Sequence, residues 1–187
     1  PAATLPLNGL TADRSLDLAG VGPGDTLLVT GAAGAVGGYV LELARLRGVH
    51  TVAVASPDDA PLVFELGAVD FVARADKLAQ PVRDVVPGGV DAVIDAAVLG
   101  ITAHEALRGG GTFVALVRPF APPPIRGTKV VVQEVFADGA RLTELSALVD
   151  AGHLTLRVAD TLRLGDAATA HERFIEERPR GRLVLVP

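Results

Sequence analysis

Hydrophobic positions along the chain follow two spacings that alternate from one segment to the next. Short runs of consecutive apolar residues, typical of buried strands, are separated by stretches whose apolar residues recur every three to four positions, as on one face of a helix. The runs predict strands at residues 26–30, 51–55, 71–73, 91–95, 112–117 and 130–136. The helical spacing predicts helices at residues 36–46, 61–66, 78–86, 102–107 and 141–151, the last one capped by Asp138.

Strands that alternate with helices of these lengths predict an α/β fold: a doubly wound parallel sheet (Rossmann fold) of about six strands, with right-handed crossovers. We expect this domain to cover residues 25–152. Before it, residues 11–19 read as a helix with Thr11 or Asp13 as its cap. After it, an extended stretch (154–164), a helix opened by Asp166 and a strand (182–186) predict a C-terminal strand-helix-strand appendage at residues 153–187.

The turn after the first strand is rich in glycine and reads G-A-A-G-A-V-G-G from Gly31 to Gly38. A dinucleotide-binding turn needs a sharp reversal, bare backbone beside the pyrophosphate and a small residue where helix and sheet meet. Gly31 and Gly34 meet the first two needs, and Gly37 meets the third. The N–H groups of Ala35 and Val36 then open the helix toward a phosphate. A turn that binds nothing is the competing interpretation, but the strand-turn-helix-strand context favours a nucleotide.

Composition excludes several other classes of function. The net charge is −5, and the 17 Lys and Arg residues are scattered, so we expect no nucleic-acid partner. The chain has no cysteine, which excludes disulfides, thiolate catalysis and a cysteine-ligated zinc site within these residues. Apolar runs are far shorter than the roughly 20 residues that cross a bilayer, so we expect no membrane span and a cytoplasmic protein. Asp91 and Asp95 lie too far apart along one strand for a carboxylate pair, so turn or cap roles are expected for them.

Four segments in order resemble one known family. They are L-P-L-N-G-L-T-A at 5–12, V-G-P-G-D-T-L-L-V-T-G-A-A-G-A-V-G at 21–37, E-L-G-A at 65–68 and R-G-R-L-V-L at 180–185. Together they resemble the zinc-independent quinone oxidoreductase and enoyl reductase branch of the medium-chain dehydrogenases/reductases. That resemblance implies an NAD(P)H-dependent enzyme that reduces a small quinone or enone. It also implies an N-terminal catalytic domain, to which residues 1–24 would be a lead-in and on which residues 153–187 would pack.

The resemblance has further implications for metal, partner and cofactor. Zinc-dependent relatives carry a cysteine ligand where this chain has Leu7, so we expect no zinc. Relatives dimerise through the strand matching residues 130–136, so we expect a homodimer. NAD-binding domains place an acid at the end of the second strand, whereas this chain has Ala55 followed by Ser56. We therefore expect NADP(H) rather than NAD(H), with Ser56 and Arg74 at the 2′-phosphate, although Asp58 and Asp59 would repel that phosphate. The alternatives are a helix cap for Ser56 and a surface charge for Arg74.

Several further residues are candidates for cofactor contacts. By the resemblance, Thr11 lies near the nicotinamide, with a helix cap as the alternative. Ala97 and Val98 follow the fourth strand, and Leu116 and Val117 follow the fifth, where doubly wound sheets bind ligands; plain packing is the alternative for them. Arg182 either reaches the cofactor or is a surface charge. No residue stands out as catalytic, and the competing function is a non-catalytic Rossmann module that serves in binding or assembly.

Overall fold

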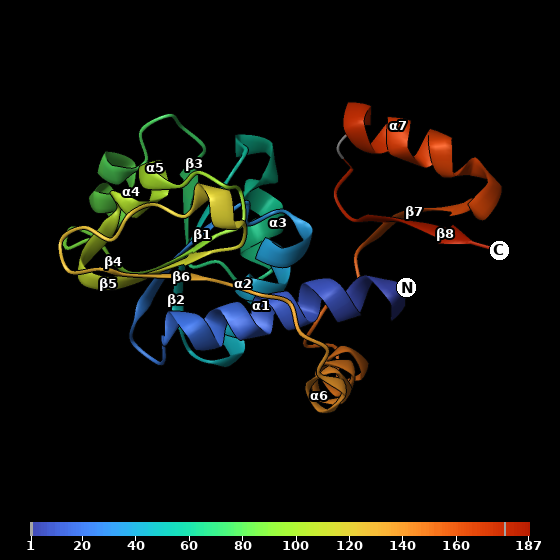
Figure 1. The fold of residues 1–187 in the computed structure, drawn as a ribbon, viewed down its shortest axis with the longest axis horizontal. Helices are drawn as coiled ribbons and strands as arrows, with labels where there is room; N and C mark the ends of the chain where they lie inside the picture. The colour runs from blue at the N-terminus through green and yellow to red at the C-terminus, as the bar shows by residue number, and fades with distance from the viewer. Residues whose placement is uncertain (1, 178) are drawn as a thin grey trace.

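Six parallel strands form the main sheet of the computed structural model, which describes residues 2–177 and 179–187 (Figure 1). Their order across the sheet is β3-β2-β1-β4-β5-β6. Their bounds are β1 (Thr26–Thr30), β2 (His50–Ala55), β3 (Asp70–Ala73), β4 (Val90–Asp95), β5 (Leu107–Ala115) and β6 (Lys129–Val132). The order reverses between β1 and β4, which opens a crevice at the carboxyl ends of these strands. The predicted doubly wound fold is confirmed.

Helices cover both faces of this sheet and bury its apolar side chains in two cores. One face carries α1 (Leu5–Ala19), α2 (Ala35–Leu46), α3 (Ala60–Glu65) and α6 (Gly139–Asp150); the other carries α4 (Ala79–Val85) and α5 (Ile101–His104). Leu27 and Val29 of β1 face the first core, and Leu28 between them faces the second. This alternation is the two-residue period of a strand that is buried on both sides. Short 3-10 turns at Ala2–Thr4, Pro57–Asp59, Arg118–Phe120 and Leu164–Asp166 complete these connections.

Helix α1 begins six residues earlier than the sequence predicts. It starts at Leu5, with Pro6 in its first turn, where a missing N–H costs nothing. Thr11 therefore lies inside the helix, and its hydroxyl donates to the Leu7 carbonyl oxygen at 2.7 Å. The prediction that Thr11 or Asp13 caps this helix is wrong. The helix ends at Ala19, and Gly20 caps it with a φ of +68°, the left-handed conformation that glycine adopts readily.

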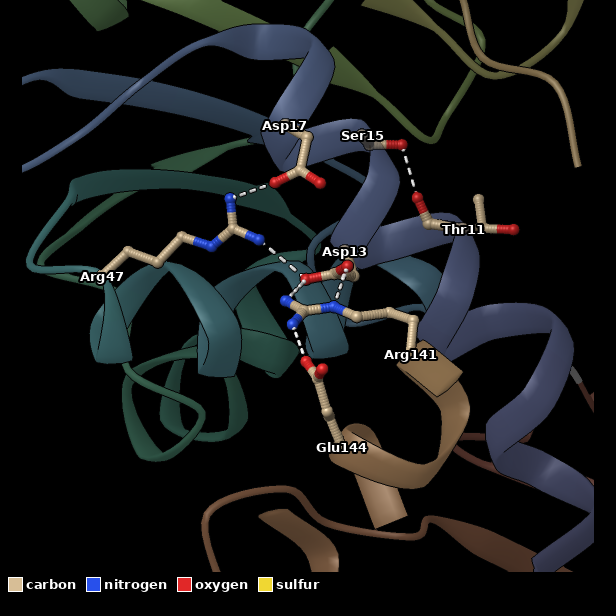
Figure 2. Close-up of polar contacts among 7 residues, drawn as sticks. All are labelled: Thr11, Asp13, Ser15, Asp17, Arg47, Arg141 and Glu144. Carbon is tan, nitrogen blue, oxygen red and sulfur yellow. Dashed lines mark hydrogen bonds and ion pairs between the residues drawn. The ribbon is translucent and has the colours of Figure 1, made fainter. Parts of the chain in front are cut away.

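A network of charged side chains joins α1 to α2 and α6 (Figure 2). The side chain of Asp13 is only 4% exposed, and the Arg141 guanidinium donates to both of its carboxylate oxygens, at 2.6 Å each. Arg47, at the end of α2, donates to Asp13 at 2.7 Å and to the exposed Asp17 at 2.7 Å. Since Ala12 and Leu16 of the same helix are fully buried in the first core, α1 is an integral part of the folded body.

Two predicted strands of the main sheet differ from the observed ones by more than one residue. The helix expected at 102–107 ends at His104, and β5 begins at Leu107, so the three glycines at 109–111 lie within a strand and not in a turn. A Cβ on Gly111 would stand 2.7 Å from the Asp91 carbonyl oxygen, so close pairing with β4 requires glycine there. β5 also ends at Ala115, before the predicted 117. β6 stops at Val132, and Val135 and Phe136, which were expected in it, are more than half exposed.

The last part of the chain forms a second, two-stranded parallel sheet beside the first (Figure 1). This C-terminal unit consists of β7 (Val158–Arg163), α7 (Ala167–Glu177) and β8 (Arg182–Val186). The predicted strand-helix-strand order and the bounds of the final strand are confirmed. Phe174 and Ile175 of α7 are 59% and 71% exposed. None of the described helices combines the length and the apolar character that a membrane crossing demands.

Candidate nucleotide-binding site

A cleft of about 650 Å³ opens at the carboxyl ends of β1 to β4, and the C-terminal unit forms its opposite wall. The main sheet contributes small residues and two charged ones to the lining, and the C-terminal unit contributes three apolar side chains, a glycine and two arginines. The lining residues are Gly31, Ala33, Gly34, Ala35, Ala55, Asp59, Arg74, Ala96, Ala97, Phe174, Ile175, Pro179, Arg180, Gly181 and Arg182. The cleft therefore lies where the order of strands reverses, the place at which doubly wound sheets bind ligands.

The glycine-rich turn between β1 and α2 forms the floor of this cleft. Gly31 has a φ of +61°, and a Cβ there would meet the Ala96 backbone at 3.2 Å. The Gly34 N–H donates to the Gly31 carbonyl oxygen at 2.8 Å, which closes the turn. A Cβ on Gly37 would stand 2.3 Å from that same oxygen, so Gly37 lets the helix sit directly on the turn. No side chain caps α2 at Gly34, so the helix presents its first N–H groups and the positive end of its dipole here.

A buried carboxylate shapes the loop that flanks the turn. Asp95, at the end of β4, is 1% exposed and accepts hydrogen bonds from the Thr30 hydroxyl at 2.6 Å and from the Gly100 N–H at 2.8 Å. The Thr30 hydroxyl oxygen in turn accepts from the Ala97 N–H at 3.0 Å. These bonds hold Ala96 and Ala97 against Gly31. The expected turn role of Asp95 is confirmed. Asp91 instead accepts the distant Thr26 N–H at 2.8 Å and pairs with Arg108 at 2.6 Å, so the turn or cap role expected for it is wrong.

An ion pair crosses the cleft near the end of β2. Arg180 donates to both carboxylate oxygens of Asp59, at 2.6 and 2.8 Å, and this contact raises the pKa of Arg180. Asp59 is 7% exposed. Asp58 is exposed and is not part of the lining. Of the two acids expected to repel a 2′-phosphate, the one in the cleft is thus neutralised by an arginine.

Six of the residues predicted to contact the cofactor are gathered in the lining: Gly31, Gly34, Ala35, Arg74, Ala97 and Arg182. The remaining candidates lie outside it: Thr11, Val36, Gly37, Ser56, Val98, Leu116 and Val117. Thr11 is buried within α1, and Val36 and Gly37 follow the turn inside α2. Val98 adjoins Ala97 with a φ of +54°, which is costly for a β-branched residue. Ser56 precedes a short 3-10 turn that its side chain does not cap.

From the sequence, Asp59 is expected near the site only as an acid that would repel a 2′-phosphate, and its pairing with Arg180 is not predicted. An acid at this position also fits the common local role of a residue in the first turn of a helix. Arg180 belongs to the R-G-R segment, of which only Arg182 was singled out. The two residues lie 121 positions apart, and no local pattern links them.

The fold and the cleft define a dinucleotide-binding domain of the Rossmann type. A family model described as zinc-binding dehydrogenase matches residues 66–185. The chain belongs to this family, within the medium-chain dehydrogenases/reductases.

Curated relatives carry the names of oxidoreductases. A 2-methylene-furan-3-one reductase from Solanum lycopersicum is 33% identical over 153 residues, which cover 81% of this chain and 37% of that protein. An NAD-dependent alcohol dehydrogenase from Saccharolobus solfataricus is 27% identical over 199 residues, covering 100% of this chain and 57% of that protein. The matched part of this chain thus spans only 37% of the one relative and 57% of the other.

Solved structures show the same fold. A quinone oxidoreductase from Coxiella burnetii superposes with a TM-score of 0.82 at 27% identity, over 98% of this chain and 59% of that one. A mycobacterial protein in complex with NADPH superposes with a TM-score of 0.83 at 27% identity, over 99% of this chain and 64% of that one. In both cases the match is the part of the longer protein that corresponds to this nucleotide-binding domain.

The family's description raises the question of zinc. Within residues 2–177 and 179–187, no three His, Cys, Asp or Glu side chains gather in a position to hold a metal ion. The chain has no cysteine, which is a principal zinc ligand. The residues that the structure describes therefore do not fit a zinc centre, whereas the glycine turn does fit a dinucleotide.

Proposed function

We propose that this chain supplies the nucleotide-binding part of an NAD(P)H-dependent oxidoreductase that reduces a quinone or an enone. The observation that carries the proposal is the bare turn at Gly31, Gly34 and Gly37, whose lack of side chains leaves the start of α2 open to a pyrophosphate. The bound nicotinamide would supply the hydride, and the protein would supply position and electrostatics. The names of the tomato reductase and of the Coxiella quinone oxidoreductase support this class of substrate.

Each part of the cleft has a role in this proposal. The turn, with the N–H groups of Ala35 and Val36, holds the pyrophosphate. The loops after β4 and β5, with Ala97, Val98, Leu116 and Val117, flank the nicotinamide. Thr11 is left out, because it is 7% exposed and its hydroxyl already donates within α1.

We propose NADP(H) as the preferred cofactor. β2 ends at Ala55, so the position where NAD-binding domains usually carry an acid is apolar. Arg74 directly follows β3, its N–H donates to the Ala55 carbonyl oxygen at 2.8 Å, and its side chain lines the cleft. Arg180 and Arg182 of the C-terminal unit line the same cleft. A guanidinium pairs well with a phosphate, and Asp59 is already neutralised by Arg180. The catalysis is proposed to be zinc-independent, because Leu7 replaces the family's cysteine ligand.

Titration of the chain with NADPH and NADH, followed by nicotinamide fluorescence, tests the main proposal. Saturable binding is expected, and it should be lost in Gly34→Leu, since a Cβ at this position already stands 3.0 Å from the Gly31 carbonyl oxygen. The matched control is Gly88→Leu in the turn before β4, where a Cβ meets nothing within 4 Å. A folded wild-type chain that binds neither nucleotide at millimolar concentration would favour the competing function, a Rossmann module used for binding or assembly.

We also propose that the protein forms a homodimer through the edge of the main sheet. β6 is the last strand in the order, and an uncovered edge strand offers free N–H and C=O groups for pairing. Val135 and Phe136 beyond it are exposed. Sedimentation at micromolar concentration should show a dimer, and Val135→Glu should shift it toward monomer. A monomeric wild-type chain would refute this assembly. The cytoplasmic location and the absence of a nucleic-acid partner stay predictions.

A further inference from the structure

Arg157 reaches the glycine-rich turn from the far end of the chain. It lies just before β7, and its guanidinium donates to the carbonyl oxygens of Ala33 at 2.9 Å and of Gly34 at 2.5 Å. Its own carbonyl oxygen accepts the Arg182 N–H at 2.9 Å. One residue thus touches both the turn and the start of β8. The two turn carbonyls are the ones that immediately precede α2.

The orientation of these carbonyls decides where the neighbouring N–H groups point. A trans peptide is planar, so the N–H of each unit points opposite to its C=O. The Gly34 carbonyl oxygen accepts from Arg157 and, at 3.0 Å, from the Gly38 N–H of α2, so the Ala35 N–H is turned the other way, and Ala35 lines the cleft. When Arg157 holds the Ala33 carbonyl, the Gly34 N–H is set to donate to the Gly31 oxygen, which closes the turn. A lysine would hold the two carbonyls less firmly, because its ammonium lacks the rigid planar fork of donors that a guanidinium presents.

The second glycine of the Gly37-Gly38 pair is explained by the same side chain. A Cβ on Gly38 would stand 2.2 Å from Nη2 of Arg157 and 2.8 Å from its Cζ. Gly37 leaves space for the turn, and Gly38 leaves space for the guanidinium that donates hydrogen bonds to the turn. One helical turn further along, Glu42 accepts the Thr155 N–H through both oxygens, at 3.0 and 3.2 Å, and so fixes the segment that carries Arg157.

We propose that Arg157 is a positioning residue: it fixes the peptide planes of the glycine-rich turn so that the first N–H groups of α2 face the pyrophosphate of the cofactor. The inference rests on the proposed function, since it assumes that a dinucleotide occupies the cleft. It adds a contact between the turn and the C-terminal unit that prepares the site before the ligand arrives. The bound pyrophosphate therefore does not have to order the turn itself.

The test compares ligands with and without a pyrophosphate. Arg157→Ala should weaken the binding of NADPH and of ADP-ribose about tenfold, as the loss of charge-assisted hydrogen bonds predicts. Binding of 2′-AMP, which lacks the pyrophosphate, should change less than about twofold on the same reasoning. The affinity of Arg157→Lys for NADPH and ADP-ribose should lie between those of the wild type and of Arg157→Ala. The matched control is Arg173→Ala, which removes an arginine of the C-terminal unit that pairs with Asp160 and Glu177 and should leave all three affinities unchanged.

A double-mutant cycle with Gly38→Ala separates positioning from folding. Alanine normally favours a helix over glycine, so this variant should remain as stable as the wild type. Its methyl group would nevertheless displace the guanidinium and weaken NADPH binding, as Arg157→Ala does. In the double variant the two losses of NADPH affinity should not add, because either change alone already removes the contact of Arg157 with the turn.

Three results would overturn the inference. Arg157→Ala could bind NADPH as tightly as the wild type, it could lose affinity for 2′-AMP to the same degree, or the two substitutions could add in full. If the wild-type chain binds NADPH normally in those experiments, the proposed function stands and only the role of Arg157 falls. A wild-type chain that binds no dinucleotide refutes both.

Discussion

Asp13 is a buried carboxylate whose charge is retained by two arginines (Figure 2). Burial alone would raise its pKa, but the hydrogen bonds and charges of Arg141 and Arg47 outweigh burial and hold the pKa below the ordinary value of 3.8. A lowered pKa in the folded state means that the folded protein binds the proton less readily than the unfolded chain does. The ionised pair therefore stabilises the fold above pH 3.8, and its contribution is lost as the pH falls through the folded-state pKa.

Asp13→Asn should consequently destabilise the protein in a pH-dependent way. At neutral pH we expect a loss of about 3 kcal/mol in the free energy of unfolding, because two arginines lose their buried counter-charge. Urea unfolding at a series of pH values should show the difference from the wild type narrowing below pH 3.8. The matched control is Asp17→Asn: Asp17 pairs with the same Arg47 but its side chain is 63% exposed, so a change of less than about 1 kcal/mol is expected. Equal losses for the two variants would show that burial of Asp13 does not matter.

At the scale of elements, the sequence predicts best the strands that turn residues bound on both sides. β1 and β8 were predicted with their observed bounds, because each is a run of strand-forming residues between glycines or turn residues. The errors arise where a glycine or proline is required by helix geometry or by tertiary packing and does not mark a turn. Pro6 and Gly9 look like interruptions of α1, but Pro6 lies in the first turn, and Gly9 lets Leu5 and Leu145 pack closely. No local pattern reveals that close approach.

In the candidate site, too, residues within a local sequence pattern could be predicted, and most residues placed by tertiary contacts could not. Gly31, Gly34 and Ala35 were predictable because one short segment contains the strand, the turn and the helix start that phosphate binding needs. Arg157 and Arg180 were not, since each acts on a residue more than a hundred positions away. Folding of the C-terminal unit over the cleft brings them there. The sequence thus predicts the part of the site that is local, and among the residues of the C-terminal wall it singles out only Arg182.

At the scale of the whole molecule, charge is distributed unevenly. The chain carries a net charge of −5, yet the cleft is lined by Arg74, Arg180 and Arg182 with Asp59 as the single acid among its lining residues. Two of these arginines come from the C-terminal unit and one from the end of β3. A cationic cleft in an anionic protein favours an anionic ligand, and it favours most the ligand with the largest charge at that position.

This arrangement predicts a salt dependence that distinguishes the two cofactors. The 2′-phosphate of NADPH adds about −1.5 to −2 charges to the ligand, and salt screens the attraction of such a charge to partly exposed arginines, since the Debye length falls below about 10 Å above 0.1 M. Between 50 and 300 mM salt, the affinity for NADPH should therefore fall several-fold more than the affinity for NADH. Arg74→Ala should weaken NADPH binding at low salt and bring the two salt dependences together. Arg83→Ala is the matched control, because Arg83 lies on α4 and contacts the Glu105 carbonyl oxygen rather than the cleft. Parallel salt dependences for NADPH and NADH in the wild type would mean that no arginine of the cleft recognises the 2′-phosphate, and the preference for NADP(H) would then be wrong even if the turn binds dinucleotides.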